Sequence, residues 1–353
     1  MLHPQDSQVP DASGRQSSNS GGAPAAASEV VTAGTGFAHA LVSKAGCEPG
    51  SRKTNQDSMF VLTNWAPAGK ATLVGVLDGH GPLGHEVSGF LRNAFPTVLA
   101  THAEALAAGD TPEALRATFA ACDEQLTASG IDCDFSGSTA VVALMDTTGR
   151  ITCAWTGDSR LVVGRRAAGG EGNHGSSPAS SPESGSTPAA RGSGSPGQKQ
   201  AQWSAVPLTF DHKPDLPGEA ERIKKAGGRV EQLVDEHGRR VGPHRVWLRT
   251  SWTPGLAMSR ALGDVVAHRA GVTSLPDIST HRLAPCDEII IAATDGLWEF
   301  IDNDEAVNLA AKHATPAAAC AALAAEAAAR WVKEEDGVCD DITILVFFNR
   351  SGQ

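Results

Sequence analysis

The strongest constraint on the fold of this 353-residue chain is a set of apolar, strand-like runs that each begin or end at an aspartate. The run Leu73–Leu77 leads directly into Asp78, and Ile289–Thr294 leads into Asp295. Taken alone, an aspartate and glycine after a strand form a turn, and His80 would be an exposed loop residue. The pattern recurs, however, at Asp57, Asp78, Asp158, Asp295 and Asp340. We therefore expect these strand ends to converge at one edge of the sheets.

Converging carboxylates predict a metal site. Carboxylates gathered away from water repel one another by an amount on the order of several kcal/mol, and hard divalent cations with oxygen ligands relieve that repulsion. Because the sequence has no paired His or Cys at ligand spacing, Mg²⁺ or Mn²⁺ fits better than structural zinc. Two such ions about 4 Å apart hold a bridging water, lower its pKa and direct it at phosphorus. The chemistry indicated is hydrolysis of a phosphate ester. Catalysis by a Ser or Cys nucleophile has less support, since no GxSxG or Cys/His signature appears.

Charge and cysteine content narrow the class of protein. With 29 Lys and Arg against 40 Asp and Glu, the net charge of −11 argues against a protein that binds nucleic acid or an anionic membrane. Seven cysteines without a CxxC pair indicate neither a disulfide framework nor a zinc ribbon. A reducing compartment follows, the cytoplasm, the nucleus or both. The N-terminus has no secretory signal, and no apolar run reaches the ~18 residues of a membrane span.

Composition also predicts how the chain is divided. Residues 1–34 are rich in Ser, Gly, Ala and Pro, which predicts a disordered tail. Residues 35–350 form one predicted domain, interrupted by a second low-complexity tract at 167–202. Because strand-like segments flank this tract on both sides, we interpret it as an enlarged hairpin loop within the domain rather than as a linker.

Helical segments stand between blocks of strands. Thr111 and Pro112 open one helix with an N-cap residue and a first-turn proline, and a second runs over residues 217–226. Thr315 and Pro316 begin an alanine-rich helix of about five turns. Since helices and strands come in blocks rather than in strict alternation, the sequence predicts an α+β fold in which helices cover the sheets.

Nine segments, in order along the chain, carry a resemblance to a known family. They are SRKTNQD (51–57), GVLDGHGPLGH (75–85), SGSTAVVAL (136–144), TGDSRLVV (156–163), LTFDHKPDLPGEAERIKKAGGRV (208–230), PGLAMSRALGD (254–264), PDIS (276–279), IIAATDGLWEF (290–300) and DDITILVFF (340–348). Through them the chain resembles the metal-dependent protein serine/threonine phosphatases of type 2C, the PPM family. Each segment alone is weak, but nine in the family's order argue strongly against coincidence. The resemblance implies two stacked antiparallel β-sheets flanked by helices, with the metals at one end of the sandwich.

The resemblance also implies roles for individual residues. Metal ligands would be Asp78, the carbonyl of Gly79, Asp295 and Asp340, with Asp57 holding metal-bound water. Arg52 matches the phosphate-binding arginine, whose guanidinium offers two parallel N–H donors to phosphate oxygens. His80 matches the proposed general acid, an imidazole that hands a proton to the departing seryl or threonyl oxygen.

Four further residues are less clearly assigned. Asp158 matches a position associated with a third, looser metal in relatives, and Glu299 stands where relatives often carry aspartate. The alternative for Asp158 is a hydrogen-bonded hairpin with a structural role only. Asp264 could serve either the fold or a metal, so it stays outside the predicted core of the site. Gln56 replaces the glutamate of some relatives, so any water-mediated anchoring there comes from a neutral amide.

The leading function is hydrolysis of phosphoserine and phosphothreonine on phosphorylated proteins. We expect a monomer that holds two Mg²⁺ or Mn²⁺ ions. Whether a third ion binds at Asp158 stays open. A catalytically silent member of the fold would act as a binding module instead, but such proteins usually lack a metal aspartate, and all are present here. A hydrolase of small phosphorylated metabolites would share the same machinery. Assays of phosphopeptides against small esters separate that alternative from the leading one.

Overall fold

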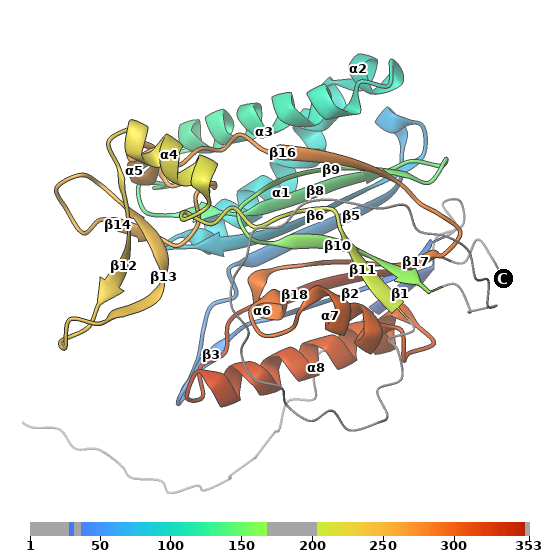
Figure 1. Cartoon of the computed structure of the whole chain (residues 1–353). Helices are drawn as coiled ribbons and strands as arrows, with labels where there is room; N and C mark the ends of the chain where they lie inside the picture. Colours follow the sequence, from blue (N-terminus) through green and yellow to red (C-terminus); the bar gives the residue numbers. More distant parts are fainter. Residues whose placement is uncertain (1–27, 32–36, 168–202, 350–353) are drawn as a thin grey trace, which may run out of the picture.

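Two antiparallel β-sheets stacked face to face form the centre of the molecule, and helices cover both outer faces (Figure 1). The structure is a computed structural model that describes residues 28–31, 37–167 and 203–349. The first sheet has the order β1 (Ser28–Val31), β2 (Phe37–Lys44), β18 (Ile342–Asn349), β17 (Asp287–Ala293), β10 (Arg160–Arg166), β11 (Trp203–Pro207). The second has the order β15 (Leu262–Gly263), β7 (Gly137–Ser138), β6 (Ala71–His80), β8 (Ala140–Met145), β9 (Arg150–Thr156), β16 (Asp277–Arg282), with β5 (Asp57–Trp65) paired to β6. The predicted two-sheet α+β fold is confirmed.

Apolar side chains fill three layers. One lies between the two sheets, and one lies under each set of helices. The helices over the second sheet are α1 (Gly84–Thr101), α2 (Ala103–Ala107) and α3 (Thr111–Ala128). Those over the first sheet are α6 (Asp295–Trp298), α7 (Asn303–Ala310) and α8 (Pro316–Glu334). Because each sheet is covered on its outer face, the strand ends are the part of the sandwich that remains free to form a site (Figure 1).

The alanine-rich helix illustrates how local sequence fixes an element. The Thr315 hydroxyl accepts a hydrogen bond from the Ala318 amide over 3.2 Å, and Pro316 occupies the first turn, where no helical N–H is needed. Small buried residues on one face let α8 pack closely on the first sheet, with Ala324 and Ala327 both at most 1% exposed. The predicted start and length of this helix agree with the structure.

Two of the predictions on chain organisation concern residues that the structure describes. Strands β10 and β11 are antiparallel neighbours, with Arg166 opposite Trp203, which agrees with the hairpin interpretation. The low-complexity tract itself lies outside the described residues from 168 onward. The predicted disordered tail 1–34 is wrong for residues 28–31, because they form β1 and pair with β2. A strand at the edge of a sheet is held by backbone hydrogen bonds to its neighbour. The polar composition of residues 1–34 therefore does not prevent residues 28–31 from forming a strand.

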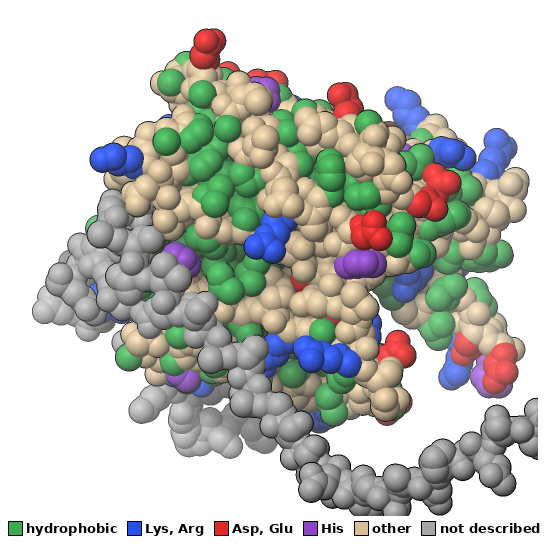
Figure 2. Space-filling model, turned by 180° about the vertical axis from the view of Figure 1, so that it is seen from behind, with side chains coloured by type: hydrophobic (Ala, Val, Ile, Leu, Met, Phe, Trp, Pro, Cys, Tyr) green, Lys and Arg blue, Asp and Glu red, His purple; other side chains and the backbone are tan. Residues whose placement is uncertain are grey.

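A small third sheet projects from the sandwich beside α4 (Pro217–Lys225) and α5 (Val265–His268) (Figure 1). We call it the flap; it consists of β12 (Arg229–Val234), β13 (Arg240–Trp247) and β14 (Pro254–Leu256). Trp247 is buried, whereas Trp252 beside it is 58% exposed and lies under the Arg229 guanidinium. The reverse view shows the flap as a separate lobe that mixes apolar and charged side chains (Figure 2).

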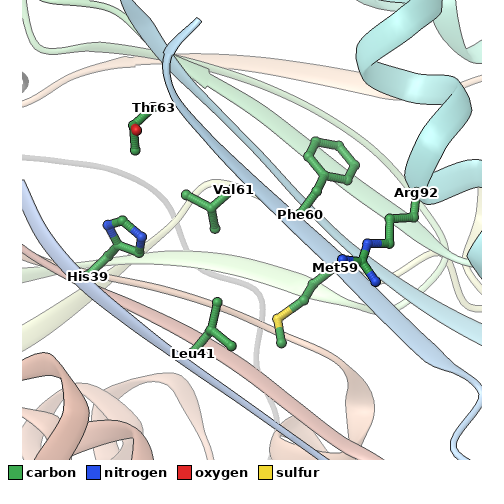
Figure 3. Close-up of a pocket in the computed structure, with 7 residues that line it drawn as sticks. All are labelled: His39, Leu41, Met59, Phe60, Val61, Thr63 and Arg92. Carbon is green, nitrogen blue, oxygen red and sulfur yellow. The ribbon is translucent and has the colours of Figure 1, made fainter. Parts of the chain in front are cut away.

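An open cavity of about 340 Å³ lies between β2 and β5 at one edge of the sandwich (Figure 3). Its lining includes His39 and Leu41 from β2, Met59 and Val61 from β5, and Arg92 from α1. None of its lining residues is among the predicted site residues. Within the described residues, no helix is both long enough and apolar enough to cross a membrane.

Candidate active site

The strand ends that carry the predicted aspartates meet at one end of the sandwich. Asp57 opens β5 and is the direct partner of Asp78 near the end of β6. Asp295 follows β17 as the first residue of α6, and Asp340 stands just before β18. Asp158 lies in the turn between β9 and β10. The other four carboxylates all act electrostatically on Asp78, so the convergence expected from the sequence is present.

Backbone packing explains the glycine between Asp78 and His80. A Cβ on Gly79 would stand 2.2 Å from the carbonyl oxygen of Gly84 and 2.5 Å from that of Gln56. The Gly79 amide also donates to the Gln56 carbonyl oxygen over 3.2 Å. Because no side chain fits there, glycine lets the end of β6 lie directly against the start of α1 and the loop before β5. This contact fixes the backbone that carries Asp78.

Three of the carboxylates form an inner group without a cationic partner. Among the described residues, no Lys, Arg or His makes an ion pair with Asp57, Asp78 or Asp295. Burial, followed by the charges of neighbouring aspartates, raises the pKa of Asp78 and of Asp295 well above the usual range. A hydrogen bond from Asp78 to Asp295 offsets only part of this effect. The inner group therefore holds protons, or requires cations, at neutral pH.

Asp57 shows the same imbalance in a milder form. Burial raises the pKa of Asp57 to about 7, although hydrogen bonds from threonine side chains act in the opposite direction. Its Oδ2 accepts from the Thr294 hydroxyl over 2.9 Å. Its Oδ1 is buried and has no hydrogen-bond partner within the described residues. A buried carboxylate oxygen without a partner is costly, so this atom is a natural ligand for a cation or an ordered water.

The two outer carboxylates each have a lysine instead. Lys53 Nζ donates to Asp340 Oδ1 over 2.9 Å, and Lys213 Nζ donates to Asp158 Oδ2 over 2.5 Å. The second oxygen of Asp158, Oδ1, is buried without a partner in the described part of the chain. Since Lys213 already neutralises Asp158, a third ion at this position would have to compete with an ammonium group.

The donor set fits hard divalent cations. It offers only oxygen atoms, from carboxylates and from the Gly79 carbonyl, and among the described residues no basic side chain forms an ion pair with the inner group. Within the described ranges, no three or more His, Cys, Asp and Glu side chains form a group that could hold a metal ion as they stand. The fit therefore rests on the charge imbalance and on the unpartnered Asp57 oxygen.

The Lys213–Asp158 pair gives a first testable prediction. In metal-free protein, Lys213→Met should lower the free energy of unfolding by about 2–3 kcal/mol, less than a fully buried pair because Lys213 is partly exposed. The reason is that a buried carboxylate loses its ammonium partner. Urea unfolding in EDTA measures the change, and Lys224→Met on the exposed face of α4 is the matched control. Adding Asp158→Asn should recover most of the loss; if it recovers none, the pair does not account for the effect.

His80 is held by an aspartate that is distant in the sequence. His80 Nε2 lies 2.6 Å from Asp264 Oδ2, and Asp264 is buried with a left-handed backbone, φ 46°. Gly137 leaves room for this carboxylate, because a Cβ there would stand 2.1 Å from Asp264 Oδ2. Burial lowers the pKa of His80, but the charge and hydrogen bond of Asp264 outweigh it, and the pKa lies above its ordinary value. The ring therefore tends to carry the extra proton that a general acid needs.

The hairpin of β3 (Cys47–Glu48) and β4 (Ser51–Arg52) borders the carboxylates. Arg52 pairs with Cys47 through the backbone of the hairpin, and its exposed side chain makes no hydrogen bond or ion pair among the described residues. The loop around it is fixed by Asp341, whose Oδ1 accepts from the Gly46 amide over 2.6 Å and whose Oδ2 accepts from the Gln56 amide over 2.7 Å. The second aspartate of the Asp340-Asp341 pair thus has a structural role.

Glu299 is not brought into the carboxylate group. It caps the C-terminal end of α6 and is exposed. Its charge acts on Arg160, and it does not appear among the leading charges that perturb Asp78 or Asp295. Its position therefore lends no support to a direct role beside the inner group.

Sequence reasoning missed three residues that complete the site. Lys53 and Lys213 neutralise the outer carboxylates, and Asp264, left unassigned between fold and metal, binds His80. Each lies inside one of the nine motif segments, and this position could have marked it as a candidate site residue. Their partners are far away along the chain, and the sequence alone does not reveal which contact each one makes.

Comparisons with known proteins agree with this geometry. The family model of protein phosphatase 2C matches residues 42–184 and 195–336. "Probable protein phosphatase 2C 72" of Arabidopsis thaliana is 35% identical over 310 residues, which cover 85% of this chain and 82% of that protein. "Probable protein phosphatase 2C 48" of Oryza sativa subsp. japonica is 32% identical, covering 86% and 82%. The fold resembles the crystal structure of serine-threonine phosphatase 2C from Toxoplasma gondii, with a TM-score of 0.68, 21% identity and coverage of 92% and 99%.

Proposed function

We propose, since this chain belongs to the protein phosphatase 2C family, that it hydrolyses phosphoserine and phosphothreonine in proteins with divalent cations held by its aspartates. The observation that carries the proposal is the inner group of Asp57, Asp78 and Asp295, three carboxylates without a cationic partner among the described residues. It lies at the end of the strand that also carries His80, the one proposed proton donor. Hydrolysis of a phosphate monoester requires carboxylates that hold cations and, beside them, a group that protonates the leaving oxygen.

The proposed metal ligands are Asp57, Asp78, the Gly79 carbonyl, Asp295 and Asp340. When bound, two Mg²⁺ or Mn²⁺ ions supply an acidified water near neutral pH and offset the negative charge of the phosphoryl group. Asp78 and Asp57 are strand partners on β6 and β5, so their carboxylates are held on a rigid base. Lys53 would give up part of its contact with Asp340 when that carboxylate turns to a cation.

His80 is proposed to protonate the departing seryl or threonyl oxygen. Asp264 accepts from His80 Nε2, which orients the ring and stabilises the imidazolium. Nδ1 is buried and has no hydrogen-bond partner within the described residues, so it is the nitrogen left to deliver a proton once the substrate reaches it. Asp264 acts through His80 and is therefore a positioning residue.

A phosphatase assay tests the proposal. Phosphoseryl and phosphothreonyl peptides should be hydrolysed with Mg²⁺ or Mn²⁺ and not with EDTA, and activity should return when the ion is added back. A catalytically silent binding module would show no turnover with either ion. If small phosphorylated metabolites were hydrolysed with a much higher kcat/KM than peptides, the proposal that proteins are the substrates would be wrong. The proposal of metal-dependent phosphate-ester hydrolysis would remain valid.

Arg52 gives a prediction about substrate binding. Arg52→Ala should raise KM for a phosphopeptide about tenfold or more, because charge-assisted hydrogen bonds to phosphate are worth roughly 1.5–3 kcal/mol. Affinity for Mn²⁺ should stay within about twofold, since Arg52 makes no contact with the carboxylates in the described structure. Steady-state kinetics and calorimetric titration check the two parts. Arg116→Ala, on the exposed face of α3, is the matched control; an equal loss of Mn²⁺ affinity in Arg52→Ala would contradict the assignment.

A further inference from the structure

Two free cysteines face each other beside the candidate site. Cys47 and Cys339 form an isolated antiparallel β-bridge, in which each amide donates to the other's carbonyl oxygen, over 2.9 and 2.8 Å. Residues paired in this way have Cα atoms about 5.5 Å apart. Disulfide-bonded cysteines usually have Cα atoms roughly 4.4–6.8 Å apart. The backbone therefore already has the separation that a disulfide needs.

The side chains also point the same way. Residues directly opposite each other across an antiparallel pair project to the same face. Both thiols pack against the same apolar cluster, under α8, with Cys339 buried and Cys47 at its half-exposed margin. A bond between them would not require either side chain to cross the backbone. The half-exposed Cys47 is the thiol that solvent reagents reach first.

This pair joins two parts of the candidate site. Cys47 is the strand partner of Arg52 in the β3–β4 hairpin, and Cys339 directly precedes Asp340. The same junction is held by the Asp341 carboxylate, which binds the Gly46 amide. A covalent link here would therefore connect the hairpin of the proposed phosphate-binding arginine to the segment of a proposed metal ligand.

We propose that Cys47 and Cys339 are a modification site, at which a peroxide forms a reversible intrachain disulfide that lowers phosphatase activity. The bond itself is independent of the function proposed above, and only its effect on turnover rests on that function. In the first step the Cys47 sulfur attacks a peroxide oxygen, the O–O bond breaks, and Cys47 becomes a sulfenic acid while one water is released. In the second step the Cys339 sulfur attacks the Cys47 sulfur, the S–O bond breaks, and a second water leaves.

The electrons balance over these two steps. Two thiols lose two electrons and two protons, and hydrogen peroxide is reduced to two molecules of water. A dithiol reductant reverses the bond by thiol–disulfide exchange. Because a disulfide has a fixed S–S length of about 2.05 Å and a dihedral near 90°, its formation ties the hairpin rigidly to the segment before β18, where two hydrogen bonds alone hold the pair in the reduced protein. A misplacement of about 1 Å in an active site can lower the rate by ~10²-fold. We expect the disulfide to have a smaller effect, a roughly tenfold fall in kcat/KM for a phosphopeptide.

The test combines thiol chemistry with kinetics on the full chain. After treatment with hydrogen peroxide, the protein should lose two titratable thiols, and a non-reduced digest should contain one linked peptide pair, carrying Cys47 and Cys339. Cys47→Ser and Cys339→Ser should each abolish the linked pair and the loss of activity. Cys286→Ser, which removes another half-exposed thiol, should behave as wild type. Dithiothreitol should restore both thiols and activity.

Several results would overturn the inference. A linked pair that excludes either cysteine, or peroxide-treated protein that keeps all its thiols, would show that the bridge does not form. If the bridge forms and kcat/KM stays unchanged, the regulatory effect is wrong. Since Cys339 is buried and its replacement could impair folding, the partly exposed Cys47→Ser decides the outcome. Counting thiols does not require phosphatase activity. A chain that shows no activity would therefore contradict the proposed function, while the formation of the disulfide would still be tested.

Discussion

Asp78→Asn should abolish most phosphopeptide hydrolysis and weaken Mn²⁺ binding together. Loss of a group that only supports a metal ligand already costs about 10- to 100-fold in affinity or activity, and Asp78 lies at the centre of the inner group. We therefore expect more than about 100-fold loss in kcat/KM. Calorimetric titration with Mn²⁺ beside steady-state kinetics measures both. Asp146→Asn, in the turn between β8 and β9, is the matched control.

The same variant should have the opposite effect on the metal-free fold. Because the charges of its neighbours and burial raise the pKa of Asp78, an uncharged amide relieves repulsion among Asp57, Asp295 and Asp78. In EDTA at neutral pH, Asp78→Asn should be more stable than wild type by about 1 kcal/mol or more, since one unit of pKa shift corresponds to ~1.4 kcal/mol. Unchanged turnover, or lower stability in EDTA, would contradict the role of Asp78.

His80→Ala should separate proton transfer from metal binding. As a general acid, His80 contributes a factor of typically 10²–10⁴, so hydrolysis of phosphoseryl peptides should slow by about that amount. An aryl phosphate, whose departing phenolate needs no proton, should be much less affected. The Mn²⁺ isotherm should stay close to that of wild type, because the ring is held by Asp264.

Two comparisons sharpen this prediction. His85→Ala removes an exposed histidine from the same motif segment and should leave both substrates unaffected. Asp264→Asn should keep a hydrogen-bond partner for the ring but lower the pKa of His80, so its activity should fall earlier than that of wild type as the pH rises. An equal loss of His80→Ala on both esters would exclude the acid role. A weakened Mn²⁺ isotherm would make the histidine part of the metal site.

The strand ends could be predicted because their signal is local. Apolar β-branched runs identify β6, β17 and β18, and aspartates at the ends of such runs mark positions that side-chain packing does not explain. The glycine after Asp78 was also informative, since the structure leaves no room for a Cβ at Gly79. Local patterns within a few residues were therefore enough for an α+β fold and for the expected convergence of the aspartates, whereas the two stacked sheets were predicted from the resemblance of the nine motif segments.

The contacts that tune the site could not be predicted in this way. The pairs Lys213–Asp158 and His80–Asp264 join segments that come together only when the sheets stack. The lysine contacts decide which carboxylates lack a cationic partner, and those contacts depend on tertiary geometry. The strand β1 was missed for a related reason: composition argued for disorder, whereas pairing with β2 depends on the backbone of a distant neighbour.

The inner aspartates also predict how stability of the metal-free protein depends on pH. The pKa of Asp57 is about 7 in the fold, against ~3.9 for an unperturbed carboxyl. A carboxyl whose pKa is raised by folding favours the folded state while it is protonated, so the metal-free protein should lose stability as pH rises from about 4 to 7. Cations should reverse this trend, because they replace the protons.

Proton release on metal binding tests the central claim most directly, that the inner aspartates hold protons which divalent cations displace. Mn²⁺ is titrated calorimetrically into EDTA-stripped, dialysed protein at pH 6 in buffers of different ionisation enthalpy, and the slope gives the number of protons released. Because the pKa values of Asp57, Asp78 and Asp295 are all raised, we expect at least one proton per protein. Asp78→Asn should release fewer. Tight Mn²⁺ binding with no proton release, identical in both proteins, would show that the ions bind elsewhere.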